Sequence, residues 1–243
     1  MASIKRRTEV TRARLLALLF PRRCPFCGAL LGADAVQGTV CLACLPEGEH
    51  AFYALGQAAA AYYYADAVRG AILRCKRGGR PWYAQELADR MAVLIFGALP
   101  ARRVGELPQY RGLHTLPLYS CIVPVPPNKP RPGVPGLPLL LARRLSAVLG
   151  IPVVTPLYIK NPGRPQKELT REERLRRAKA AFACRPGTDL TGKRVLLVDD
   201  IITTGATASA CAVALLQAGA IEVTAAAIAA TEELPKAQQK KER

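Results

Sequence analysis

The sequence predicts an α/β protein whose mostly parallel sheet is flanked by helices, preceded by a small module built on four cysteines. The first observation is an uninterrupted apolar run at residues 195–198, which is typical of a parallel strand buried on both faces. An Ala-rich helix follows and ends near Gln217, before Gly219, and a second strand over 221–230 completes a βαβ unit. Two Cys-x-x-Cys pairs near the amino terminus indicate the module.

Further elements are expected between these two regions. The consecutive tyrosines at 62–64 favour a strand packed on the core, with a stacking platform for nucleic-acid bases as the alternative. A strand over 121–125, a helix over 139–149 and a short strand near 152–158 are expected next.

This pattern divides the 243 residues into three parts. Residues 1–50 are expected to hold a basic helix and the cysteine module, 51–232 the α/β domain, and 233–243 a charged, disordered tail. The apolar run at 15–20 is too short for a membrane-spanning helix or an ordinary signal peptide. Residues 4–20 can form a basic amphipathic helix that packs on the module or touches an anionic surface.

The composition is strongly basic. Lys and Arg number 35 against 18 Asp and Glu, which gives a formal net charge of +17. This balance favours anionic partners such as nucleic acid, phosphorylated substrates or lipid headgroups, and it does not choose among them.

Four cysteines form the two pairs, Cys24 with Cys27 and Cys41 with Cys44, with thirteen residues between the pairs. Four thiolates at this spacing suit tetrahedral zinc, and because sulfur fills every position, a structural role is expected rather than a catalytic one. Two disulfides or a redox pair are the alternatives. The remaining cysteines are expected to be buried or free thiols, which fits a reducing, cytoplasmic location. They are Cys75, Cys121, Cys184 and Cys211.

Two adjacent carboxylates, Asp199 and Asp200, stand at the carboxyl end of the buried strand, where open α/β sheets place their ligands. We expect both carboxylates to be exposed. The turn that follows is rich in small residues, so its backbone N–H groups and threonine hydroxyls can surround a phosphate. Its residues are Thr203, Thr204, Gly205, Ala206 and Thr207. The pattern predicts a site for a phosphorylated sugar, and an ordinary turn with a polar helix cap is the alternative.

The sequence VLLVDDIITTGAT at 195–207 resembles the phosphoribosyl pyrophosphate (PRPP) motif of type I phosphoribosyltransferases. Together with the amino-terminal cysteine pairs, it resembles the ComF/GntX family, whose best-known members are bacterial competence proteins needed for DNA uptake. The resemblance implies the type I phosphoribosyltransferase fold. It also implies that Asp199 and Asp200 hold the ribose hydroxyls at the catalytic centre, and that the turn at 203–207 holds the 5-phosphate.

Other local matches extend the resemblance over residues 15–231. The segment 64–79, which includes Lys76, is similar to the family's central LKYxG element, and 122–126 is similar to the start of its pyrophosphate loop. The sequence departs from the family at 131–138, where an RGFNQ-like element is expected and neither Gln nor Asn is present.

Candidate ligands of the diphosphate lie in two segments. Lys129 and Arg131 are the cations of a stiff, Pro-rich loop, which is either a pyrophosphate cradle or a surface turn. In the family that the sequence resembles, the basic segment that follows is a mobile hood, in which Arg164 and Lys167 would bring positive charge onto the diphosphate. A solvated basic helix over 170–183 is the alternative.

The resemblance implies a transferase that binds PRPP with Mg²⁺ and transfers the phosphoribosyl group to a base or amine, in nucleotide salvage linked to DNA uptake. No general base is evident, because His50 and His114 lie outside the motifs. The alternative is a non-catalytic adaptor for DNA uptake, which senses PRPP or a nucleotide and binds single-stranded DNA or partner proteins.

Overall fold

The structure is a computed structural model that describes residues 23–31, 41–44, 58–64, 66–77, 83–101, 109–111, 119–160 and 181–231. The expected basic helix at 4–20, the hood residues Arg164 and Lys167, and the charged tail lie outside these residues. His50 and His114 also lie outside them.

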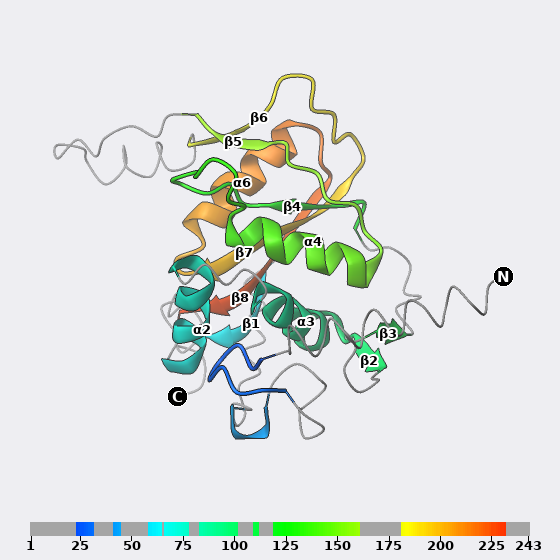
Figure 1. Ribbon diagram of the computed structural model, residues 1–243. Coiled ribbons are helices and arrows are strands. Elements are labelled where there is room, and N and C mark those ends of the chain that lie inside the picture. The colour runs from blue at the N-terminus through cyan, green and yellow to red at the C-terminus, as the bar shows by residue number, and fades with distance from the viewer. Residues whose placement is uncertain are drawn as a thin grey trace, which may run out of the picture.

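A four-stranded parallel sheet forms the centre of the described fold (Figure 1). Its strands, in spatial order, are β1 (Ala58–Tyr63), β8 (Glu222–Ala230), β7 (Arg194–Ile202) and β4 (Cys121–Pro124). All three neighbouring pairs run parallel. The prediction of an α/β fold with a mostly parallel sheet is confirmed.

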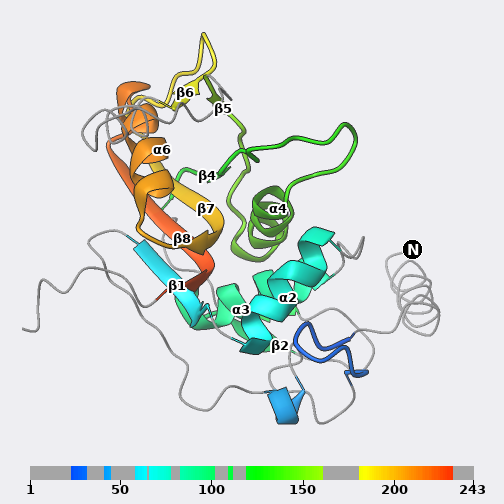
Figure 2. The ribbon, with the colours of Figure 1, turned by 90° about the vertical axis from the view of Figure 1, so that its left-hand side faces the viewer.

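Helices cover both faces of this sheet, as Figures 1 and 2 show. α3 (Tyr83–Phe96) and α4 (Leu137–Leu149) pack on one face, and α2 (Asp66–Arg77) packs against α3. α6 (Ala206–Gln217) packs on the opposite face and joins β7 to β8, which confirms the βαβ unit. Among the described residues, no helix is both long and apolar enough to span a membrane. The smaller elements are η1 (Leu42–Cys44), β2 (Leu99–Ala101), β3 (Gln109–Arg111), β5 (Leu157–Ile159) and β6 (Phe182–Cys184).

β7 is buried on both faces, because its side chains alternate between two apolar clusters. Leu196 and Val198 pack in the cluster that includes residues of α3 and α4, whereas Val195 and Leu197 pack in the cluster that includes residues of α6. All four side chains are almost completely buried. This confirms the interpretation of the apolar run as a parallel strand covered on two sides.

Several predicted boundaries agree closely with the structure. α6 ends at Gln217, and Gly219 follows it with a φ of +98°. β8 begins at Glu222, one residue later than expected. α4 begins two residues earlier than expected, after the extended Gly136, because Pro138 fits a first helical turn, where no backbone N–H is needed.

Two predictions are wrong in part. The strand expected over 152–158 is shorter, because β5 begins near the expected end and Val153 forms only an isolated bridge with Ile122. The helix considered for 170–183 does not reach its expected end, because Phe182–Cys184 form β6, antiparallel to β5. Pairing with β5 outweighs the local helical pattern there, as is common for short strands.

The described cysteine loops pack against α2 and β1. The ring of Phe26 meets that of Tyr62 edge to face, with centroids 5.5 Å apart and planes at 83°. Tyr62 is 1% exposed, which confirms core packing for this tyrosine of β1. Arg74 of α2 donates hydrogen bonds to the carbonyl oxygens of Pro25, at 2.8 Å, and Phe26. The boundary expected near residue 50 stays a prediction.

Candidate functional site

The two acids lie at the carboxyl end of β7, inside the strand rather than after it. β7 continues through Ile202, so the ladder with β8 extends past both carboxylates. Asp199 is partly buried, and Asp200 is 9% exposed. The prediction that both carboxylates are exposed is therefore wrong, and Asp200 is in contact with α2.

Lys76, near the carboxyl end of α2, makes this contact. Its Nζ lies 2.8 Å from Asp200 Oδ2, and 40% of the lysine side chain is exposed, against 12% of the aspartate side chain. Asp199 Oδ1 accepts a hydrogen bond from the Asp200 backbone N–H at 2.8 Å. Sequence reasoning placed Lys76 in a family-like element without a role, because a contact between α2 and β7 has no local signal.

The charge of Asp200 affects the ionisation of Asp199. Burial and the charge of Asp200 raise the pKa of Asp199 to about 7, while the Asp200 N–H and Lys76 act in the opposite direction. A carboxyl group with this pKa exchanges its proton near neutral pH, and it can accept or donate a hydrogen bond. The pair therefore suits a ligand that presents hydroxyl groups.

The turn between β7 and α6 presents small polar groups at the surface. Thr203, Thr204 and Thr207 are exposed, and Gly205 has a φ of +74°, which glycine adopts without strain. Thr204 Oγ1 accepts a hydrogen bond from the Ala206 N–H at 3.4 Å, where α6 begins. The first N–H groups of a helix have no partner within it and carry partial positive charge. The turn and the helix start can therefore bind a phosphate.

The loop from β4 to α4 leaves the same edge of the sheet, because β4 and β7 are parallel neighbours. The Val125 N–H donates to the carbonyl oxygen of Val198 at 2.9 Å, so this loop starts beside the residue that precedes Asp199. Lys129 and Arg131 are exposed on the loop, which projects away from the sheet in Figure 2. Within the described residues, neither cation forms an ion pair with the acids.

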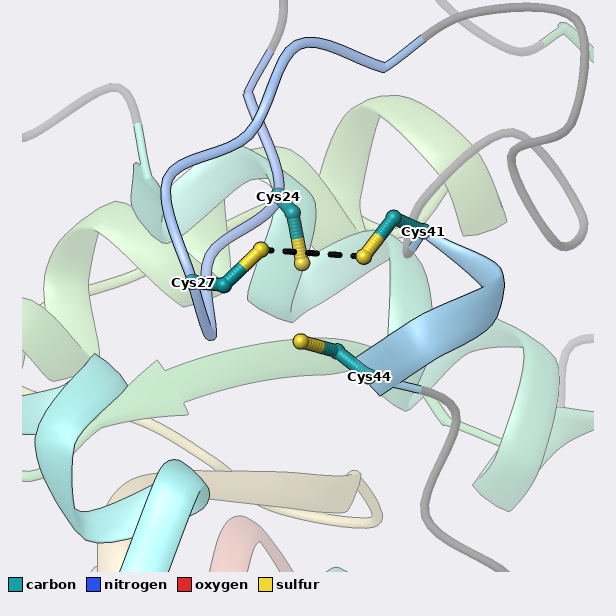
Figure 3. A group of neighbouring side chains, drawn as sticks. All are labelled: Cys24, Cys27, Cys41 and Cys44. Atoms are coloured by element: carbon teal, nitrogen blue, oxygen red, sulfur yellow. Dashed lines mark hydrogen bonds between the residues drawn. The ribbon is translucent and has the colours of Figure 1, made fainter.

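The four paired cysteines come together in space (Figure 3). The Sγ atoms of Cys24, Cys27, Cys41 and Cys44 all lie within 4.8 Å of one another. The Gly28 N–H closes the first turn onto the carbonyl oxygen of Cys24 at 2.8 Å. A tetrahedral zinc ion with bonds of about 2.3 Å needs sulfurs about 3.8 Å apart. Cys27 Sγ and Cys41 Sγ are 3.6 Å apart, so the donor set fits such an ion.

The pKa shifts of these cysteines are also consistent with a metal site. Burial and hydrogen bonding with Cys27 raise the pKa of Cys41 and Cys44. Burial acts against ionisation of Cys27 as well, but the Ala29 N–H and the neighbouring sulfurs lower its pKa. Crowded thiolates repel one another, and a divalent cation removes that repulsion. All eight cysteines are free thiols, so the alternative of two disulfides is not present in the structure, and the cluster can hold a metal ion.

Comparison with known proteins decides the type of domain. Residues 133–243 match the family model described as "Phosphoribosyl transferase domain". The chain carries a phosphoribosyltransferase domain. The match includes β7 with the acid pair, the threonine turn, α6 and β8, and the four-cysteine cluster precedes it. Assignment to the ComF/GntX family stays a prediction.

A curated relative is the adenine phosphoribosyltransferase of Nocardia farcinica, which is 37% identical over 98 residues. The match covers 40% of this chain and 50% of that protein, so the chain spans about half the length of the curated relative that it matches.

Two solved structures show partial similarity to the chain. The glutamine phosphoribosylpyrophosphate amidotransferase of B. subtilis, complexed with ADP and GMP, is 25% identical, with a TM-score of 0.33 over 46% of this chain and 23% of that chain. The purine phosphoribosyltransferase of Pyrococcus horikoshii is also 25% identical, with a TM-score of 0.32 over 49% of this chain and 67% of that chain.

Proposed function

We propose that this protein is a phosphoribosyltransferase of the ComF/GntX type, which binds PRPP with Mg²⁺ and transfers its phosphoribosyl group to a base or amine. The observation that supports it most is the order of groups along one edge of the sheet. Two acids lie near the carboxyl end of β7, an exposed threonine turn follows the strand, and α6 begins there. A ribose 5-phosphate needs carboxylates for its hydroxyls and amide N–H groups for its phosphate, close together.

In this proposal, Asp199 and Asp200 accept hydrogen bonds from the two ribose hydroxyls. The turn residues Thr203, Thr204, Gly205, Ala206 and Thr207 hold the 5-phosphate through hydroxyls and backbone N–H groups. Lys129, Arg131, Arg164 and Lys167 are the proposed ligands of the diphosphate.

Transfer breaks the bond between C1 of the ribose and the diphosphate oxygen, which leaves with the bonding electrons. A new bond forms from C1 to the acceptor nitrogen, which then releases a proton to solvent. The transition state has oxocarbenium character, like that of glycoside cleavage, and the carboxylates stabilise its positive charge. Bound Mg²⁺ would supply positive charge to the diphosphate.

The acceptor is proposed to be a nitrogen that needs little activation, such as that of a free base released from imported DNA. The name of the relative from Nocardia farcinica supports a base in preference to an aliphatic amine. The four-cysteine cluster is proposed to hold a structural zinc ion, because four sulfurs leave no position for water or substrate.

The test is isothermal titration of PRPP with Mg²⁺ into the full chain, followed by measurement of pyrophosphate release with a series of free bases and amines. Asp189→Asn serves as the control, because this exposed aspartate precedes β7 at the opposite end of the strand. We expect saturable binding in the wild type and in the control, and release with at least one acceptor. Absence of PRPP binding in the wild type would exclude the proposed function.

A second candidate function is a DNA-uptake adaptor without catalysis. The net charge of +17 and the exposed Lys129 and Arg131 favour weak, sequence-independent binding of single-stranded DNA. Such binding must weaken steeply with salt, because it depends on the release of counterions. Fluorescence titration with single-stranded DNA at several salt concentrations tests it, and binding that is insensitive to salt would exclude this candidate.

A further inference from the structure

The contact between α2 and β7 gives Lys76 a place beside the acid pair. We propose that Lys76 is a positioning residue of the ribose-phosphate site. It orients the Asp200 carboxylate toward a ribose hydroxyl, and its positive charge reduces the repulsion between that carboxylate and the phosphates of the ligand. This inference rests on the proposed function, because it assigns Lys76 a part in the binding of PRPP.

The geometry leaves room for a ligand on Asp200. Lys76 Nζ donates to Oδ2 at 2.8 Å, a length typical of a charge-assisted hydrogen bond. A carboxylate has about four acceptor sites on its two oxygens, so it can accept a hydroxyl group while the lysine remains bound. The lysine side chain is 40% exposed, which keeps the pair in reach of a ligand from solvent.

The charges explain why a cation is needed at this place. Two adjacent carboxylates oppose each other's ionisation, and they also repel phosphate groups bound at the turn that follows them. A lysine bound to one of them lowers this repulsion without removing the acceptor oxygens. Lys76 thus contributes to binding of the ribose, by positioning Asp200, and to binding of the phosphate, by reducing repulsion.

A purely structural role explains Lys76 less well. α2 is held by other contacts, since its residues Val68, Ala71 and Ile72 are buried and Arg74 binds the carbonyl oxygens of the first cysteine loop. The ion pair is partly exposed through Lys76, which limits its contribution to stability. The loss of the Lys76 charge is therefore expected to leave the fold intact.

Among the described residues, the other ionisable groups that interact electrostatically with the acid pair are two neutral thiols. Cys75 of α2 and Cys211 of α6 both have a pKa raised to about 12, mainly by burial. On the side of β8, the residue paired with Asp199 is Ala227. A change in the titration of Asp199 after substitution of Lys76 can therefore be assigned to the lysine charge.

The first test needs no ligand. The carboxyl carbon of Asp199 is titrated by NMR in the wild type and in the variants Lys76→Met, Lys76→Arg and Lys193→Met. Lys193 is a matched control, because it is exposed and stands just before β7, at the end opposite the acids. We expect the titration midpoint of Asp199 to move to higher pH in Lys76→Met, and to stay near the wild-type value in the other two variants.

The second test measures PRPP affinity, with Mg²⁺, in the same four proteins, and a thermal melt of each confirms that it is folded. Lys76→Met is expected to weaken binding by about tenfold, which corresponds to about 1.4 kcal/mol, whereas Lys76→Arg and Lys193→Met bind like the wild type. Recovery of affinity by arginine would not be expected if the lysine acted only through packing.

The two tests separate the two proposals. If the wild type fails to bind PRPP, the proposed function is wrong, while the titration still shows whether Lys76 controls the charge of the acid pair. If the wild type binds PRPP and Lys76→Met binds equally well, the positioning role is wrong. An Asp199 titration that is the same in Lys76→Met and the wild type would also overturn it.

Discussion

Asp89 and the acid pair of β7 are carboxylates that differ in their cationic partners. Asp89, on α3, is 0% exposed and receives two hydrogen bonds from Arg144 of α4, at 2.6 Å from Nε and 3.1 Å from Nη2. At the end of β7, two carboxylates stand side by side, and Lys76 binds only an oxygen of Asp200. The negative charge of Asp89 is therefore balanced by a cation of the chain, whereas the two negative charges of the acid pair share one cation.

This difference distinguishes a carboxylate that stabilises the fold from carboxylates that are available to bind a ligand. A buried carboxylate with a bidentate arginine has its acceptors occupied on both oxygens, so it joins α3 to α4 and has little left to offer a ligand. The acid pair keeps unused acceptors and an unfavourable charge, which a ligand with hydroxyl groups can relieve. Stability is expected to depend on the first site, and affinity on the second.

The largest effect is expected at the cysteine cluster, where a bound metal ion would supply the charge that balances the thiolates. Structural zinc in small modules contributes on the order of 10 kcal/mol to folding, so chelation should unfold the amino-terminal module and leave PRPP binding partly intact. Metal analysis should find about one zinc per chain in the wild type and well under one in Cys44→Ser. Cys184→Ser, which changes a partly buried thiol outside the cluster, should retain the metal. A full zinc content in Cys44→Ser would refute this assignment.

The second largest effect is expected at the buried ion pair of Asp89 and Arg144. Asp89→Ala leaves Arg144 without this carboxylate partner in the core, and it should lower the free energy of unfolding by about 3–5 kcal/mol. Urea denaturation measures the loss. Glu222→Gln is the control, because the Arg194–Glu222 pair, at 3.3 Å, is exposed and should contribute less than about 1 kcal/mol. Equal losses in the two variants would mean that burial does not distinguish these pairs.

The unfavourable charge of the acid pair should make the stability of the protein depend on pH. The pKa of Asp199 is about 7 in the folded protein, above the value of about 4 for an unfolded chain, so the folded state binds the extra proton between these pH values. Stability should therefore fall as pH rises from about 4 to about 7. Asp199→Asn removes this loss and should be more stable than the wild type above pH 7, by roughly 1–3 kcal/mol.

Urea denaturation at several pH values measures this effect, and Asp189→Asn provides a control of opposite sign. Hydrogen bonds with Thr191 lower the pKa of Asp189, so its contribution is present at neutral pH and lost in acid. If Asp199→Asn and the wild type have parallel pH profiles, Asp199 does not carry the unfavourable charge.

The smallest energetic effect should be the most specific one. Asp200→Asn removes charge without changing shape, so PRPP affinity should fall by roughly tenfold or more, about 1.4 kcal/mol, while stability hardly changes. Thr204→Val removes a hydroxyl group from the turn and should cause a similar loss. Thr188→Val, which changes a partly buried threonine outside the turn, is the control. Calorimetric titration and thermal melts decide the outcome, and unchanged affinity in both site variants would show that the motif does not bind PRPP.

Local spacing along the chain determines a large part of this protein. The apolar run at 195–198, the two acids that follow it and the Ala-rich helix predict the βαβ unit, because each depends on neighbours within a few positions. The same holds for the Cys-x-x-Cys pairs, since two residues between ligands suit one turn of backbone around a metal. These features are confirmed as a strand, a helix and a sulfur cluster.

Tertiary structure decided the partners of the charges. Arg144 is the partner of Asp89 and Lys76 that of Asp200, yet each pair joins residues far apart in the chain, which no local pattern links. Phe182–Cys184 form a strand for the same reason, because β5 supplies the hydrogen bonds. A sequence carries propensities that act over one turn or one strand, whereas the energy of a buried charge depends on the group that folding brings against it.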